Sequence, residues 1–254
     1  MARRNMFSSS GNPFMKEEAY RNSSNEILDG GMTGVSTGRM TVQGAINKSF
    51  ILFGLMMLTS VVSFAYPSPL FLWAGIIGGL IAVLVGSFKP HLSATVAPIY
   101  ALLEGLFVGS ITAMYAGLFE GIVFRAITLT FALLFAMLFI YKTGIIKVTD
   151  KFRMGVVMAT FAVFLVYLVN IILSFFGINM PFLHEGGALG IGISVVIIGI
   201  ASLNLLLDFD NFEKGERFGA PAYMEWFSAM GLLITLVWLY VELLRLLAML
   251  AGRD

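Results

Sequence analysis

Apolar residues are arranged along the chain in seven long runs that are separated by short polar breaks. The runs cover roughly residues 45–65, 70–88, 94–115, 122–141, 154–176, 187–207 and 222–250. Each run is long enough to cross about 30 Å of hydrocarbon as an α-helix, which takes about 20 residues. They are continuous and do not alternate with a period of two, which favours helices over the strands of a membrane barrel. The pattern therefore predicts an all-α integral membrane protein with seven transmembrane helices.

The first 44 residues have a different character from the rest of the chain. They are polar and rich in Ser, Asn, Gly and Met, with several basic residues among them. Such a segment buries too little apolar surface to fold, which predicts a disordered cytoplasmic tail over residues 1–44 and a membrane domain over residues 45–254. No apolar stretch follows Arg3 and Arg4 closely enough to form a signal peptide.

The overall composition supports a membrane protein and excludes several kinds of chemistry. Of the 254 residues, 58% are hydrophobic and 12% are charged, whereas a soluble domain is roughly 25% charged. The absence of cysteine excludes disulfides and cysteine metal sites. The net charge of +1 comes with no basic stripe on a soluble face, so we expect no nucleic-acid partner.

The basic residues predict how the helices are oriented. With seven spans, thirteen of the sixteen Lys and Arg residues fall on the side of the tail, and Arg125, Arg245 and Arg253 fall on the other side. Because cytoplasmic segments are enriched in Lys and Arg, the N-terminus is predicted to be cytoplasmic and the C-terminus outside. The two histidines, His91 and His184, then lie on opposite sides of the membrane and cannot form one site. An enzyme is therefore the least favoured class of function.

Two pairs of glycines show the spacing of closely packed membrane helices. Gly75 and Gly79 are four residues apart, as are Gly105 and Gly109. Small residues at this spacing let two helices approach closely. The alternative is that these glycines only reflect how common Gly is in membrane helices.

A few ionisable residues are predicted at membrane depth, where each costs at least ~2.5 kcal/mol on insertion scales. Glu104 lies near the middle of the third run. It is either a neutral acid that is hydrogen-bonded to a neighbouring helix or part of a pathway or gate. Glu242 and Arg245 are three residues apart and share a helix face, which predicts an ion pair near the outer surface that anchors the last helix.

Two aspartates, Asp208 and Asp210, follow the sixth run. If the helix continues, Asp208 shares a face with Asn204 and Asn211, whereas Asp210 points the other way, towards a loop. The seventh run carries a matching polar stripe of Ser228, Gly231, Thr235 and Glu242. The two stripes are predicted to face each other and to line a wet interior.

Asp208 is the strongest candidate for a functional residue in these stripes. At a helix C-terminus the helix dipole disfavours a negative charge, and partial burial disfavours it as well. These effects predict either a protonated carboxyl group or a bound cation. The alternative is an aspartate at a frayed helix end in cytoplasmic water.

Four segments of the chain resemble the Bax-inhibitor family of transmembrane proteins, and its bacterial branch most. They are "ALLEGLFVG", "VTDKFRMG", "LNLLLDFDNFEKG" and "EWFSAMGLLITLVWLYVELLRLLAML", within a similarity that begins near residue 42. The resemblance implies six helices around a central C-terminal helix, in the inner membrane of a bacterium. It also implies a pH-dependent calcium leak, and in eukaryotic members the suppression of cell death.

The resemblance also implies roles for single residues. Asp208 matches an aspartate of the family that shares a proton with an acid of the seventh helix, and Glu104 matches an acid of the third helix. The seventh-helix acid aligns with either Thr235 or Glu242. Depth favours Thr235, because Glu242 lies about 10 Å further out. Without a second acid, Asp208 would titrate alone or with Glu104.

The leading hypothesis is a pH-sensitive leak pathway for cations, calcium above all, with protons and the lipid bilayer as the other partners and no bound cofactor. Carboxylate, amide and hydroxyl oxygens suit calcium. Asp208 would be the switch and a calcium ligand, Glu104 a gate, and Asn204, Asn211 and Thr235 supporting oxygen donors. The alternative is a non-transporting membrane protein that regulates a membrane protease or a stress response through the tail and the 208–221 segment.

Overall fold

The computed structural model describes residues 38–176 and 187–252, and these residues are almost entirely helical. The elements are α2 (Val42–Ala65), α3 (Pro69–Phe88), the short 3₁₀ helix η2 (Pro90–Leu92), α4 (Ser93–Leu118), α5 (Ile122–Thr143), α6 (Asp150–Phe175), α8 (Ala188–Arg217) and α9 (Tyr223–Ala251). Seven spans in this part of the chain are long and apolar enough to cross a membrane, η2 being continuous with α4 in the third. The predicted all-α membrane fold is confirmed.

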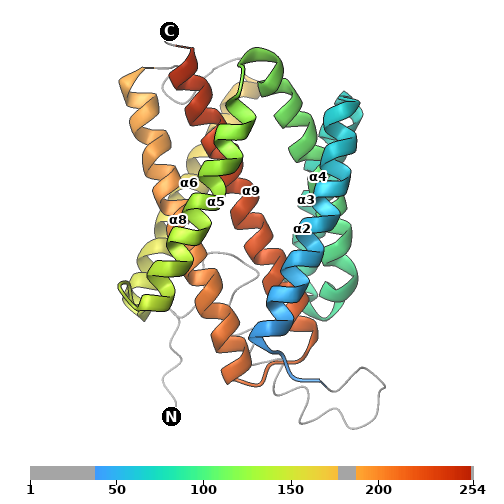
Figure 1. Ribbon diagram of the computed structural model, residues 1–254, viewed down its shortest axis with the longest axis vertical. Helices are drawn as coiled ribbons and strands as arrows, with labels where there is room; N and C mark the ends of the chain where they lie inside the picture. The colour runs from blue at the N-terminus through green and yellow to red at the C-terminus, as the bar shows by residue number, and fades with distance from the viewer. Residues whose placement is uncertain (1–37, 177–186, 253–254) are drawn as a thin grey trace.

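Helix α9 lies in the middle of the bundle. In Figure 1, α9 runs obliquely between α2, α3 and α4 on one side and α5, α6 and α8 on the other. It packs against α2, α4, α5 and α8. The last helix of the chain is therefore the central one, as the family resemblance implied.

Local sequence signals set several helix ends. The hydroxyls of Ser68 and Thr149 accept hydrogen bonds from the backbone of the first turns of α3 and α6, which satisfies amide groups that have no partner within the helix. Pro69, at the first position of α3, has no amide hydrogen to satisfy. Gly144 ends α5 with a φ of 69°, a left-handed conformation that favours glycine.

The two glycine pairs lie where helices approach most closely. Gly105 and Gly109 of α4 face α2, where an added Cβ would overlap the backbone carbonyls of Met56 and Ser60. A Cβ added at Gly75 of α3 would lie 2.7 Å from a backbone nitrogen of α4. Close packing at these spacings, predicted from the sequence, is confirmed, and α4 is held tightly between α2 and α3.

Helical structure begins slightly before residue 45, where the membrane domain was predicted to start. Helix α2 begins at Val42, and the residues just before it contact the turn between α8 and α9. The Met40 amide donates to the carbonyl of Ala220 at 2.6 Å, and the Ala222 amide donates to the carbonyl of Gly38 at 2.8 Å. The remainder of the predicted tail, residues 1–37, lies outside the described residues, as does His184.

The sixth span ends later than residue 207, where the apolar run ends. Helix α8 continues ten residues past 207, to Arg217, so only residues 218–222 connect it to α9. The added residues include Glu213, Lys214 and Glu216, which are good helix formers although they are charged. Gly219, with a φ of 66°, then allows the chain to turn. With 30 residues, α8 is about 45 Å long and exceeds the hydrocarbon thickness.

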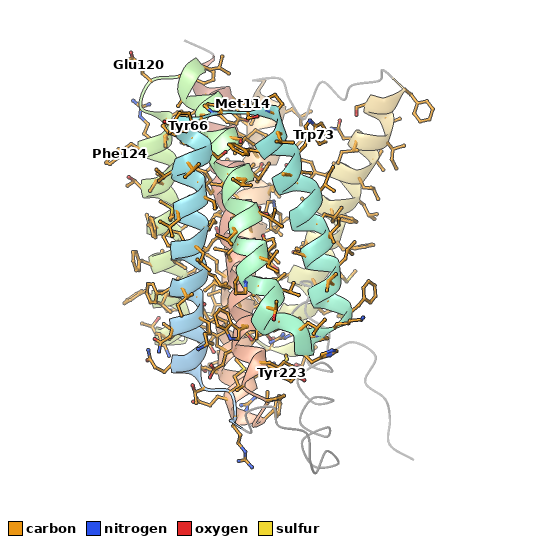
Figure 2. All side chains as sticks on the ribbon, turned by 90° about the vertical axis from the view of Figure 1, so that its right-hand side faces the viewer. Tyr66, Trp73, Met114, Glu120, Phe124 and Tyr223 are labelled. Atoms are coloured by element: carbon orange, nitrogen blue, oxygen red, sulfur yellow. The ribbon has the colours of Figure 1, made fainter. Side chains whose placement is uncertain are left out.

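Large apolar side chains cover the outward faces of the bundle, as expected for helices that face lipid (Figure 2). Tyr66 and Trp73 lie near one end of the bundle and are 75% and 59% exposed, whereas Tyr223 lies near the opposite end. Aromatic residues with a polar atom are typical of the membrane–water interface. Figure 2 therefore shows the long axis of the bundle in the direction of the membrane normal.

Candidate functional site

Asp208 is buried in the interior of the bundle. Asp208 is 1% exposed. It lies on α8, which packs against α6 and α9. The hydroxyl of Thr235 of α9 is a hydrogen-bonding partner of the Asp208 carboxylate. Arg153 of α6 is the positive charge near this carboxylate. The second carboxylate oxygen, Oδ2, is buried and has no partner within the protein. Asp208 thus combines burial, a counter-charge and a free acceptor.

Arg153 is the cation of this site and is itself 1% exposed. Its Nη1 donates to Oδ1 of Asn211 at 2.8 Å, and its Nη2 forms an ion pair with Asp210. The ammonium group of Lys214, one turn further along α8, lies 3.1 Å from the same Asp210 carboxylate. Two cations and two carboxylates meet here, so the cluster is neutral when all four groups are ionised.

Two expectations about the aspartates are corrected. Asp208 does not end a helix, because nine residues of α8 follow it. The effect of the helix dipole is confined to the last turn and therefore does not act on Asp208. Asp210 does not face a loop but pairs with a buried arginine of α6. Both errors have one cause, which is that α8 continues through a charged stretch.

Asn204 lies on α8 one turn before Asp208 and connects it to α6. Its side-chain amide donates to the hydroxyl of Thr160 at 2.8 Å and to the carbonyl of Ile200 at 2.9 Å. Asn204, Asp208 and Asn211 thus all make contacts with α6 or α9, as their shared helix face predicted.

Glu242 lies further along α9, and it has more partners than the predicted ion pair. The ion pair with Arg245 is present. However, Glu242 is only 3% exposed and also accepts hydrogen bonds from Tyr167 of α6 at 2.9 Å and from Ser194 of α8 at 2.8 Å. The pair therefore connects α6, α8 and α9 and is buried inside the bundle.

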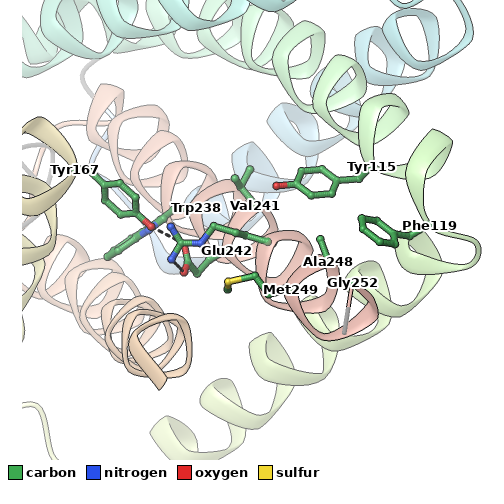
Figure 3. A pocket seen from close by; sticks show the side chains of 10 residues that line it. Tyr115, Phe119, Tyr167, Trp238, Val241, Glu242, Ala248, Met249 and Gly252 are labelled. Atoms are coloured by element: carbon green, nitrogen blue, oxygen red, sulfur yellow. Dashed lines mark hydrogen bonds and ion pairs between the residues drawn. The ribbon is translucent and has the colours of Figure 1, made fainter. Parts of the chain in front are cut away.

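A cavity of about 610 Å³ opens beside this ion pair. Figure 3 shows it between α4, α6 and α9, with the aromatic rings of Tyr115 and Phe119 on one side and Tyr167 on the other. The Arg245 guanidinium lies 5.4 Å from the centre of the Tyr167 ring, within the range of a cation–π contact. The cavity thus has aromatic walls and a charged pair at its inner side.

The structure places Thr235, and not Glu242, opposite Asp208. Glu242 follows Thr235 by seven residues, which is about 10 Å along α9. No carboxylate of α9 is therefore in position to share a proton with Asp208. The chain therefore differs from the family pattern, in which an acid of the seventh helix lies opposite this aspartate.

Glu104 lies in another part of the bundle. Its side chain interacts with Tyr100 of the same helix, and its Oε2 lies 2.9 Å from the position of a Cβ added at Gly79 of α3. Glu104 and Asp208 are not among each other's interacting groups. The structure therefore does not bring together the two acids that were considered as a titrating pair.

Few side chains near Asp208 could act as ligands of a bound metal ion. Within residues 38–176 and 187–252, no group of three or more His, Cys, Asp or Glu side chains could hold a metal ion. Asp208 and Thr235 offer one carboxylate and one hydroxyl, whereas calcium takes six to eight oxygen ligands. A calcium ion at Asp208 stays a prediction, and it would keep most of its water.

Sequence reasoning missed the residues of α6. Arg153 is one of the thirteen basic residues on the side of the tail, and the sequence-based prediction gives no role to it or to Thr160 and Tyr167. A signal was present, since Arg153, Thr160 and Tyr167 are each seven residues apart and therefore share one helix face. A polar stripe within an apolar helix indicates the side that faces the protein.

The fold and the buried polar site define a class: an integral membrane protein in which six helices surround a C-terminal helix and charged side chains lie inside the bundle. The comparison with family models gives the particular family. The model described as Bax inhibitor 1 like matches residues 5–252, nearly the whole chain, and the chain belongs to this family. The comparison with curated proteins finds no match.

Proposed function

We propose that this protein is a proton-sensitive leak pathway for cations, with calcium as the best-suited ion, in the inner membrane of a bacterium. The observation that carries the proposal is Asp208, an aspartate with 1% exposure inside a membrane-spanning helix and with one carboxylate oxygen left unpaired. A buried acid without a full set of partners is costly in a membrane protein, so it needs a functional reason.

Arg153 supplies the second part of the proposed mechanism. A cation that reaches Asp208 competes with the guanidinium of Arg153 for the same negative charge. Protonation of Asp208 removes that charge and leaves Arg153 with Asp210 and Asn211. Proton uptake therefore changes both the attraction for a cation and the contact between α6 and α8. In this scheme Asp208 acts without a partner acid, unlike the aspartate of the family resemblance.

The proposed orientation has the N-terminus in the cytoplasm and the C-terminus outside. It rests on the excess of Lys and Arg on one side of the membrane. The Arg153 cluster then belongs to the cytoplasmic half of the bundle, and the cavity beside Arg245 belongs to the outer half. No catalytic role is assigned to any residue.

The test is calcium flux through the purified protein in liposomes. Asp208→Asn keeps the size of the side chain and removes its proton equilibrium, so the flux should lose its dependence on pH. Glu120→Gln is the matched control, because Glu120 is exposed at the end of the bundle that also carries Tyr66, and it should leave the pH profile as it was. An Asp208→Asn protein with normal flux and a normal pH profile would refute the proposal.

The alternative function, an interaction protein that regulates a membrane protease or a stress response, has an observation in its favour. Residues 38–41 are attached to the α8–α9 turn, and Glu225 of α9 accepts hydrogen bonds from both the amide and the hydroxyl of Thr41, each at 3.0 Å. Any partner that binds the preceding segment would act directly on this turn. Deletion of residues 1–37, which leaves the attachment intact, discriminates: a lost phenotype with normal flux favours the interaction protein.

A further inference from the structure

Helix α6 contacts the bundle through a regular series of polar side chains. Arg153, Thr160 and Tyr167 are seven residues apart, so successive members are separated by about 10 Å along one helix face. They pair respectively with Asn211 at 2.8 Å, Asn204 at 2.8 Å and Glu242 at 2.9 Å. We call these three pairs the polar seam. It extends over about 20 Å, most of the thickness of the hydrocarbon.

Apolar packing contributes little to the attachment of α6. The main hydrophobic core cluster contains buried residues from α2, α3, α4, α5, α8 and α9 but none from α6. Within α6, Arg153 and Val156 are the buried residues of the described chain, whereas most of the large apolar side chains of this helix are exposed. The side of α6 that faces the protein is therefore defined by the polar seam.

Every buried polar side-chain atom that lacks a partner within the described chain lies on the helices of the polar seam. The five atoms are Arg153 Nε, Asn170 Oδ1, Asp208 Oδ2, Asn211 Nδ2 and Arg245 Nε. They come only from α6, α8 and α9, although polar residues are also buried in α2, α4 and α5. Buried polar groups are nearly always hydrogen-bonded to protein or to water. The clustering of the exceptions along one seam indicates a place where water enters the protein.

The polar seam ends at the cavity beside Arg245. Tyr167 and Glu242 form its last pair and also line the cavity of about 610 Å³, which is far larger than one water molecule needs (Figure 3). At the other end, Arg153 lies beside Asp208. The seam therefore connects an open cavity in one half of the bundle with the buried carboxylate in the other half.

We infer that the polar seam is a hydrated passage along α6, through which water and hard cations move between the cavity at Arg245 and Asp208. This inference rests on the proposed function, because it takes Asp208 to be the group that binds the cation at the end of the passage. Its side chains offer hydroxyl, amide and carboxylate oxygens, which are the ligands of hard cations such as calcium. Thr160 and Asn204 form its middle step and determine what passes.

Single-cysteine labelling tests the passage, and the natural chain contains no cysteine that would interfere. A Thr160→Cys protein in liposomes is treated with a water-soluble methanethiosulfonate that carries a trimethylammonium group, and the modified fraction is measured by intact mass. Reaction requires a thiolate and therefore water at the thiol. We expect Thr160→Cys to react at least about tenfold faster than the two controls.

The controls match the depth and the chemistry of the test residue. Met158→Cys lies two residues away on the outward face of α6, where Met158 is 65% exposed on the outside of the bundle. Thr130→Cys replaces a threonine of α5 whose hydroxyl donates to its own helix at 2.8 Å. Should Thr160→Cys fail to fold, Ser194→Cys tests the same seam, because the Ser194 hydroxyl donates to Glu242.

The result that supports the passage is rapid labelling of Thr160→Cys together with a fall in cation flux on labelling. Labelling no faster than at Met158→Cys overturns it, and so does rapid labelling of a conducting protein that leaves its flux unchanged. The two proposals fail separately. If Asp208→Asn loses its pH dependence while Thr160→Cys stays unreactive, the passage is wrong and the proposed function stands. If Thr160→Cys reacts while the unlabelled protein conducts nothing, the hydrated seam stands and the proposed function fails.

Discussion

Replacement of Arg153 by methionine should destabilise the protein substantially. Arg153 is 1% exposed and lies among Asp208, Asp210 and Asn211. Removal of one partner from a buried ion pair costs about 3–5 kcal/mol, because the other charge stays buried without compensation. Lys214 remains 3.1 Å from Asp210 in the variant, so we expect the lower end of that range, about 3 kcal/mol.

The assay is equilibrium unfolding in mixed detergent micelles, followed by the fluorescence of the three tryptophans. The loss of unfolding free energy should shrink on acidification, because an unpaired buried carboxylate can bind a proton in place of its lost partner. Adding Asp210→Asn to Arg153→Met should recover part of the loss, since the two side chains are paired and their effects are not additive.

The matched control is Arg125→Met, the same substitution at an exposed arginine of α5. It should change the unfolding free energy by no more than about 0.5 kcal/mol. The reasoning is refuted if Arg153→Met costs less than about 1 kcal/mol and the cost does not depend on pH, because a surface ion pair behaves in that way.

Three further substitutions test the packing and the hydrogen bonds of the bundle. In the same unfolding assay, Gly105→Ala should destabilise the protein by about 1–3 kcal/mol, because the added Cβ overlaps the α2 backbone. Gly54→Ala is the control and should be neutral or mildly stabilising, because a Cβ added there meets nothing within 4 Å. Tyr167→Phe should cost about 1.5–3 kcal/mol, because a buried carboxylate loses a donor; Tyr66→Phe, at an exposed site, should cost nothing measurable. Glu225→Gln should weaken the attachment of the residues before α2, seen as faster amide hydrogen exchange there, and unchanged exchange would contradict the assigned contacts.

Much of the fold could be predicted from the hydrophobic pattern because the bilayer imposes it. Seven apolar runs became seven spans, and the glycines at Gly105 and Gly109 marked a close helix contact. The end of α8 could not be predicted in the same way. Apolarity indicates where a helix lies in lipid, but the helix of residues 208–217 depends on local propensity and on contacts with α6. A fall in hydrophobicity therefore does not mark the end of a helix.

The candidate site was predicted in part. Periodicity placed Asp208 and Asn204 on an inward face, and depth along α9 indicated Thr235 as the residue opposite Asp208. Periodicity places Arg153 on one face with Thr160 and Tyr167, but it could not reveal the partners of Arg153, which lie 57 and 58 residues away in the sequence. Long-range ion pairs leave no local pattern, so Asp210 was wrongly assigned to a loop. The roles of these residues in ion transport stay predictions.

The position of α9 has a consequence for how the protein is made. The ribosome delivers the central helix last, after the six helices that surround it. Until then, the face of α2 that packs against α9 is uncovered. Thr41 also lacks its hydrogen-bond acceptor Glu225, which is 184 residues further along the chain. Contacts between such distant residues form slowly, since a long loop must close first. The contacts that α2, α4, α5 and α8 make with α9 therefore form only after the last helix has been inserted.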